Sequence, residues 1–147
     1  MLPMFVEAVD ESGGRVVWLF TGRTNSDDDF AQYCASIERL NALEVRGLRV
    51  AVLVVDTGNP MPNARWRKEI ADASREVAPN TVFILVGNAL ARGVATAINW
   101  IRRPTYELRT AATFTDAAQI AEEWAGEPMP ELRSLYVEAR GRIHAVA

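Results

Sequence analysis

A small group of polar residues follows the most apolar segment of the chain. The segment at 48–55 is rich in valine, and Asp56, Thr57, Gly58 and Asn59 come directly after it. An apolar run of this length predicts a strand buried on both faces of a parallel sheet. Open α/β sheets place functional groups at the carboxyl ends of such strands. The alternative is a plain turn, in which the aspartate accepts backbone hydrogen bonds and the glycine supplies a positive φ.

Three cations begin the next expected helix, which Asn63 can cap. Arg65, Arg67 and Lys68 have the wrong sign for the helix dipole at this end, at a cost of about 0.3–1 kcal/mol each. Their placement favours anion binding, to a phosphate, a nucleotide or an acidic partner surface. The alternative is a solvated, self-paired helix face, with the pairs Arg65–Glu69, Lys68–Asp72 and Asp72–Arg75.

Histidine and cysteine are too scarce for several common kinds of active site. The chain has one histidine, His144, and one cysteine, Cys34. This excludes histidine-based triads, the usual zinc sites and Cys–His nucleophile pairs. Cys34 falls in the apolar stripe of an expected helix, so we interpret it as a small buried hydrophobe. We expect no catalytic residue, no metal ligand and no bound cofactor.

The composition is that of a single globular domain. The 147 residues are 49% hydrophobic and 24% charged, with a net charge of −3 and a pI near 5.2. This acidic balance argues against nucleic-acid binding through general basicity. No apolar stretch is long enough for membrane insertion, and one cysteine cannot form an internal disulfide. We therefore expect a cytoplasmic protein.

Strands and helices are expected to alternate along the chain. Apolar segments at 4–9 and 15–22, on either side of a turn-rich loop, predict a hairpin. Further strands are expected at 48–56, 81–87 and 106–114. Helices are expected from Ser26, over 64–78, from Asn88 with Leu90 facing inward, from a Thr115-Asp116 cap to Trp124, and over 131–144. This order predicts an α/β domain with a mainly parallel mixed sheet of about five strands, an N-terminal hairpin, four covering helices and an extra C-terminal helix.

We expect a domain boundary near Pro128. Residues 1–127 would form the domain, and residues 128–147 a helical extension. This extension would pack on the domain or on a partner, and pairing with its counterpart in a second chain would give a homodimer.

The element order, together with Val54-Val55-Asp56-Thr57-Gly58, resembles the STAS domain of anti-sigma-factor antagonists and its STAS-like bacterial relatives. The resemblance covers roughly residues 4–125. It includes the stretches Arg92-Gly93-Val94 through Trp100, Tyr106-Glu107-Leu108-Arg109, and Thr113-Phe114-Thr115-Asp116-Ala117-Ala118 leading to Trp124.

In the antagonist branch of this family, the third strand ends in Asp-Ser-Ser-Gly or a close variant, and a partner kinase phosphorylates the residue after Asp. Carried over by position, that residue is Thr57. This chain departs from the pattern with Gly58 in place of the second hydroxyl residue and Asn59 in place of the glycine.

The resemblance implies a non-enzymatic, bacterial regulatory protein that binds a protein partner, such as a regulatory kinase or a signalling complex. Phosphorylation of Thr57 would add a charge of about −1.5 to −2 and could switch that binding. The expected contact surface consists of Asp56, Gly58, Asn59, Arg65, Arg67 and Lys68.

Two other functions stay open. A domain of the same fold could bind a small ligand, a lipid or a nucleotide, which predicts a pocket between the helices and the sheet. A small α/β enzyme using Asp56 would need a second titratable group that converges on this carboxylate.

Overall fold

Five strands and five helices make up the part of the chain that the computed structural model describes, residues 4–45, 47–101 and 104–146. The strands are β1 (Phe5–Asp10), β2 (Arg15–Phe20), β3 (Arg49–Val55), β4 (Thr81–Val86) and β5 (Glu107–Ala111). The helices are α1 (Asp27–Ala42), α2 (Ala64–Ser74), α3 (Ala89–Ile101), α4 (Phe114–Ala125) and α5 (Pro130–Val146).

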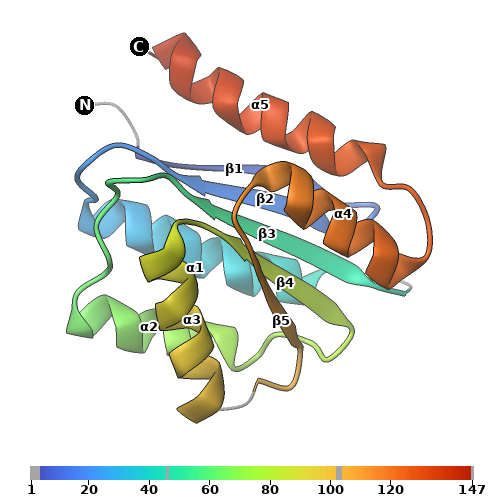
Figure 1. The fold of residues 1–147 in the computed structure, drawn as a ribbon, viewed down its shortest axis with the longest axis horizontal. Helices are drawn as coiled ribbons and strands as arrows, with labels where there is room; N and C mark the ends of the chain where they lie inside the picture. Colours follow the sequence, from blue (N-terminus) through green and yellow to red (C-terminus); the bar gives the residue numbers. More distant parts are fainter. Residues whose placement is uncertain (1–3, 46, 102–103, 147) are drawn as a thin grey trace.

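The strands lie in the sheet in the order of the sequence (Figure 1). β1 and β2 form the predicted antiparallel hairpin, and β2 to β5 are parallel neighbours. β3 lies between β2 and β4, which confirms the interior position predicted for the valine-rich segment. The predicted α/β class and mixed sheet are therefore correct.

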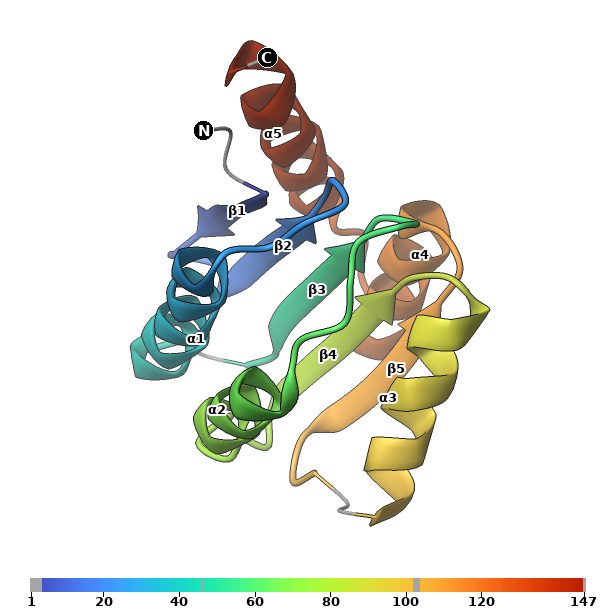
Figure 2. The ribbon, with the colours of Figure 1, turned by 90° about the vertical axis from the view of Figure 1, so that its left-hand side faces the viewer.

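The helices cover both faces of the sheet. Each parallel crossover moves one strand further in the same direction, and such crossovers are almost always right-handed. As a result α1, α2 and α3 lie on one face, while α4 and α5 lie on the other (Figures 1 and 2).

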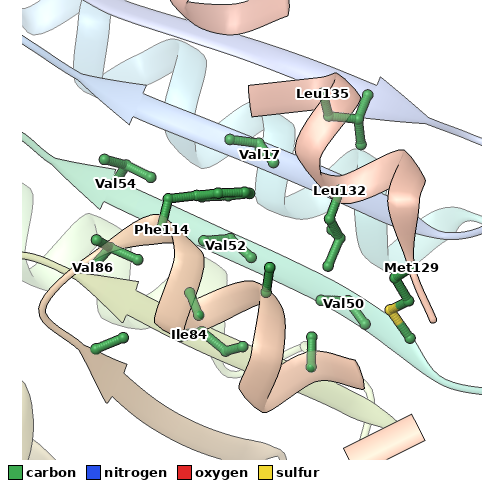
Figure 3. Close-up of a cluster of buried hydrophobic side chains, with 14 of the residues drawn as sticks. Val17, Val50, Val52, Val54, Ile84, Val86, Phe114, Met129, Leu132 and Leu135 are labelled. Carbon is green, nitrogen blue, oxygen red and sulfur yellow. The ribbon is translucent and has the colours of Figure 1, made fainter. Parts of the chain in front are cut away.

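The two faces have different cores. The face under α1 and α2 is aromatic, with Trp18 fully buried at its centre and its Nε1 donating to Ser36 Oγ at 2.6 Å. The face under α4 and α5 is aliphatic, and alanines of α4 allow that helix to approach the sheet closely. Figure 3 shows the aliphatic cluster, which includes Val17, Val50, Val52, Val54, Ile84 and Val86 from the sheet.

The C-terminal helix packs on the domain's own sheet. α5 contacts β1 and β2, and Met129, Leu132 and Ala139 are fully buried in the aliphatic cluster. Met129 and α5 therefore complete the cover of this face.

Two of the predicted helix starts are correct in detail. Ser26 caps α1 in a capping box with Asp29, and the Asn63 side chain accepts a hydrogen bond from the Trp66 amide at the start of α2. Both caps satisfy amide groups that the helix leaves without a partner.

Four predicted details are wrong. β5 ends at Ala111, three residues before the predicted end. α4 is capped by Thr113, whose Oγ1 accepts from the Asp116 amide at 3.2 Å, so Thr115 and Asp116 lie within the first turn. α2 ends at Ser74, four residues before the predicted end. Leu90, predicted to face inward, is 70% exposed.

The hairpin glycine Gly14 gives a prediction for stability. Its φ is +67°, and a Cβ there would meet the side chain of Val45 at 2.8 Å. Gly47 has a similar φ of +89° but open space around it. Gly47→Ala should cost about 1–2 kcal/mol of unfolding free energy, from the left-handed backbone alone. Gly14→Ala should cost about 1–3 kcal/mol more, because of overpacking. Urea denaturation of both variants measures this difference, and equal losses would contradict it.

Candidate functional site

The Asp56 carboxylate, at the exit of β3, is paired with Arg140 of α5. Arg140 Nη1 donates to Asp56 Oδ2 at 2.5 Å, and Nη2 donates to Oδ1 at 2.6 Å. Thr21 Oγ1 also donates to Oδ2, at 2.8 Å. Both carboxylate oxygens are therefore occupied, in the bidentate geometry that gives the strongest ion pairs. We call the Asp56–Arg140 pair the latch.

Aromatic side chains hold the arginine of the latch in place. Arg140 Nε donates to the Tyr136 hydroxyl at 3.0 Å, and its guanidinium carbon lies 5.2 Å from the centre of the Tyr136 ring. That ring stacks on Phe114 of α4, with centroids 4.1 Å apart. The side chains of Arg140 and Asp56 are 32% and 25% exposed. The latch is thus partly shielded from water. Solvent and salt therefore screen its attraction less than they screen that of a fully exposed ion pair.

The latch keeps Asp56 ionised. Burial by itself raises the pKa of this carboxyl, but the hydrogen bonds from Arg140 and Thr21 and the charge of Arg140 outweigh it. The pKa of Asp56 is therefore below its ordinary value, and the pKa of Arg140 is raised by its bonds to Asp56. A carboxylate with a lowered pKa and both oxygens occupied is a poor general base.

The residues after β3 form a hydrogen-bonded turn, which we call the exit turn (Asp56 to Asn59). The Asn59 amide donates to the Asp56 carbonyl at 3.0 Å, and Gly58 at the third position has φ +92°. This is the pattern of a type II turn. Thr57 and Gly58 are exposed at its tip.

Asn59 ties the exit turn to the loop after β2. Its Nδ2 donates to the Thr21 carbonyl at 2.9 Å, and its amide group exchanges hydrogen bonds with the amide of Asn25. The side chains of Asp56 and Asn59 thus make their hydrogen bonds to other residues of the protein. Of the contact residues predicted in this segment, Gly58 is exposed, and so is the predicted phosphoacceptor Thr57.

The three cations of α2 do not converge on one point. Arg65 lies 3.8 Å from Asp27 of α1 and over the ring of Trp66, and it makes no ion pair with Glu69. Arg67 donates to the Pro62 carbonyl and lines a groove described below. Lys68 is exposed. Arg67 is two residues after Arg65 and one before Lys68, so it points in a different direction from both. Arg65 and Lys68 share a face of the helix, but Arg65 is directed toward Asp27.

A groove of about 400 Å³ opens between α2 and α3 over the aromatic face of the sheet. Its floor consists of side chains from three neighbouring strands, and its walls come from α2, α3 and the segments before α2 and β5. The floor residues are Leu53, Phe83, Leu85 and Leu108. The groove lies between the helices and the sheet, where the ligand-binding alternative predicts a pocket.

The other reactive groups in the described residues give little sign of chemistry. Cys34 packs against the aromatic cluster, and burial raises the pKa of its thiol, which disfavours the nucleophilic thiolate. No three side chains of the described ranges form a metal-binding group. None of the helices in these ranges has both the length and the apolar character needed to cross a membrane.

Sequence reasoning missed the partners of Asp56. Thr21 could have been found, because β2 and β3 are parallel neighbours and Phe20 lies opposite Val55. Arg140 gave a weaker signal: it lies one turn after Tyr136, at the border of the apolar stripe of α5. A sequence separation of 84 positions from Asp56 hides the contact from any local pattern.

No protein-family model matches the chain, and no curated protein or solved structure matches it either. The exit turn, the latch and the groove are therefore the features on which a proposal for function rests.

The latch should couple α5 to the centre of the sheet. Asp56→Asn and Arg140→Gln should each lower the unfolding free energy by about 1–3 kcal/mol, and the double variant should lose less than the sum. Denaturant unfolding of the four proteins gives the coupling energy. The Glu138–Arg142 pair of α5, whose side chains are 47% and 50% exposed, serves as the control and should show weaker coupling. Additive losses at Asp56 and Arg140 would contradict the latch.

The lowered pKa of Asp56 sets the sign of a pH effect. In acid, the unfolded chain binds a proton at this carboxyl before the folded protein does, so stability falls as the pH drops through the folded pKa. Between about pH 5 and pH 2 the wild type should lose more stability than Asp56→Asn, which has no proton to bind. Unfolding free energies across this range test the prediction. It fails if the two curves stay parallel.

Proposed function

We propose that this protein is a non-enzymatic, STAS-like regulatory module that binds a protein partner at the exit turn, and that phosphorylation of Thr57 switches this binding. The observation that carries the proposal is the exposed Thr57 at the second position of a turn anchored on both sides. Asp56 holds one side through the latch, and Asn59 holds the other through Thr21 and Asn25.

An anchored turn suits recognition by a protein. A loop that is already ordered has less conformational entropy to lose on binding, so more of the contact energy appears as affinity. Thr57 and Gly58 offer a small, uncharged tip, and the exposed Lys68 adds a cation from α2 to the proposed contact surface.

A phosphate on Thr57 would change the charge of this surface without help from any catalytic group in the protein. It would add about −1.5 to −2 charges next to the Asp56 carboxylate. The guanidinium of Arg140 already donates hydrogen bonds to both oxygens of that carboxylate. The uncharged tip would become strongly anionic. A partner that fits one charge state would then be disfavoured by the other.

The occupied carboxylate supports a non-enzymatic role over an enzyme using Asp56. An acid–base or nucleophilic role needs a free oxygen on the carboxylate and a second group that converges with it. Both carboxylate oxygens of Asp56 instead accept hydrogen bonds, from Arg140 and Thr21.

The proposal is tested in cells that naturally express the protein. Phosphopeptide analysis should find phosphate on Thr57. Tagged wild type and Thr57→Val should retain the same partner, and Thr57→Glu should change its recovery by about tenfold in either direction. Thr24→Val, which removes another exposed hydroxyl, is the matched control and should behave as wild type. An unmodified Thr57, together with equal partner recovery by Thr57→Glu, would refute the switch.

A further inference from the structure

We propose that the groove between α2 and α3 binds a small amphiphile with one apolar chain and one anionic headgroup, and that Arg67 contacts this headgroup. The inference is independent of the switch at Thr57.

The floor of the groove is a continuous apolar surface. In the sheet register, Leu53 lies opposite Leu85, and Phe83 lies opposite Leu108, so the four side chains form one patch across β3, β4 and β5. A volume of about 400 Å³ falls within the range of small-molecule sites. The polar edge of a nucleotide base would find no partner on this floor, whereas an alkyl chain would bury well.

The groove is open because α2 is held toward α1. Trp66 of α2 stacks on Phe30 of α1, with centroids 5.6 Å apart, and its Nε1 donates to Asp27 Oδ1 at 2.7 Å. The helix then ends at Ser74. Specific bonds thus hold α2 against α1, and between α2 and α3 the leucines of the floor are only partly buried. An apolar ligand in the groove would complete the burial of these leucine side chains.

The charge of the lining selects the headgroup. Two arginines, Arg67 and Arg75, lie among the described lining residues, and no aspartate or glutamate does. Arg75 is paired with Asp72 at 3.0 Å. Within the described ranges, Arg67 has no carboxylate within 4 Å, and one of its nitrogens bonds to the Pro62 carbonyl. The rim therefore offers an uncompensated guanidinium beside an apolar floor, which fits a carboxylate or phosphate attached to an apolar chain.

The test uses dodecanoate and the uncharged dodecanol as probes, with binding measured by calorimetry and by amide chemical shifts. The wild type should bind dodecanoate more tightly than dodecanol. Ala71→Trp fills the groove from an exposed position on α2 and should weaken both probes at least tenfold. Arg67→Gln should weaken dodecanoate about tenfold and leave dodecanol unchanged. Lys68→Gln removes a neighbouring cation that does not line the groove, and it should change neither affinity.

Each contrary outcome overturns the proposal. It fails if the wild type binds neither probe, if Ala71→Trp binds as well as the wild type while its circular dichroism stays native, or if AMP binds more tightly than dodecanoate. Equal effects of Arg67→Gln and Lys68→Gln would remove Arg67 from the headgroup site. Thr57→Val should bind dodecanoate like the wild type, so failure of this proposal and failure of the switch at Thr57 are separate results.

Discussion

The latch between Asp56 and Arg140 fixes the position of α5 on the sheet, where the other contacts of this helix are mainly apolar. α5 packs on β1 and β2 through side chains of the aliphatic cluster, and apolar burial alone does not fix how far a helix slides along a sheet. A bidentate guanidinium–carboxylate pair does, because its two hydrogen bonds require one orientation. Asp56 is also the first residue of the exit turn, so the same bond sets the position of α5 and the conformation of the loop that follows β3.

The order of the strands explains where a site can form in this fold. In doubly wound sheets the strand order reverses, and ligands bind in the crevice at that reversal. Here each strand lies beside its predecessor, so the parallel part of the sheet has no such point. The carboxyl end of β3 is instead closed by Arg140 and by the loop after β2. The open surface lies on the face of the sheet, where α2 leans on α1 and leaves a gap before α3.

The fold was easier to predict than the site because its signals are local. The apolar runs gave the strands, and Ser26 and Asn63 marked two helix starts through hydrogen bonds that span three residues. The errors arose where contacts between distant parts of the chain determine the local structure. Thr113 could cap α4 because β5 ends at Ala111, earlier than its pattern indicates. The site depends on Arg140 and on the bond from Trp66 to Asp27, and both contacts join segments far apart in the chain.

The two proposed surfaces share one short segment of backbone, residues 60–63. At one end of it, the Pro60 carbonyl accepts from Asn25, which also holds the exit turn. Further along, Met61 and Pro62 line the groove, and the Pro62 carbonyl orients Arg67. If a phosphate on Thr57 shifts this segment, it changes the groove. By thermodynamic linkage, a ligand in the groove must then change partner binding at the exit turn by the same factor. A shared segment of this kind is the simplest physical route by which an apolar ligand and a phosphate could regulate one protein contact.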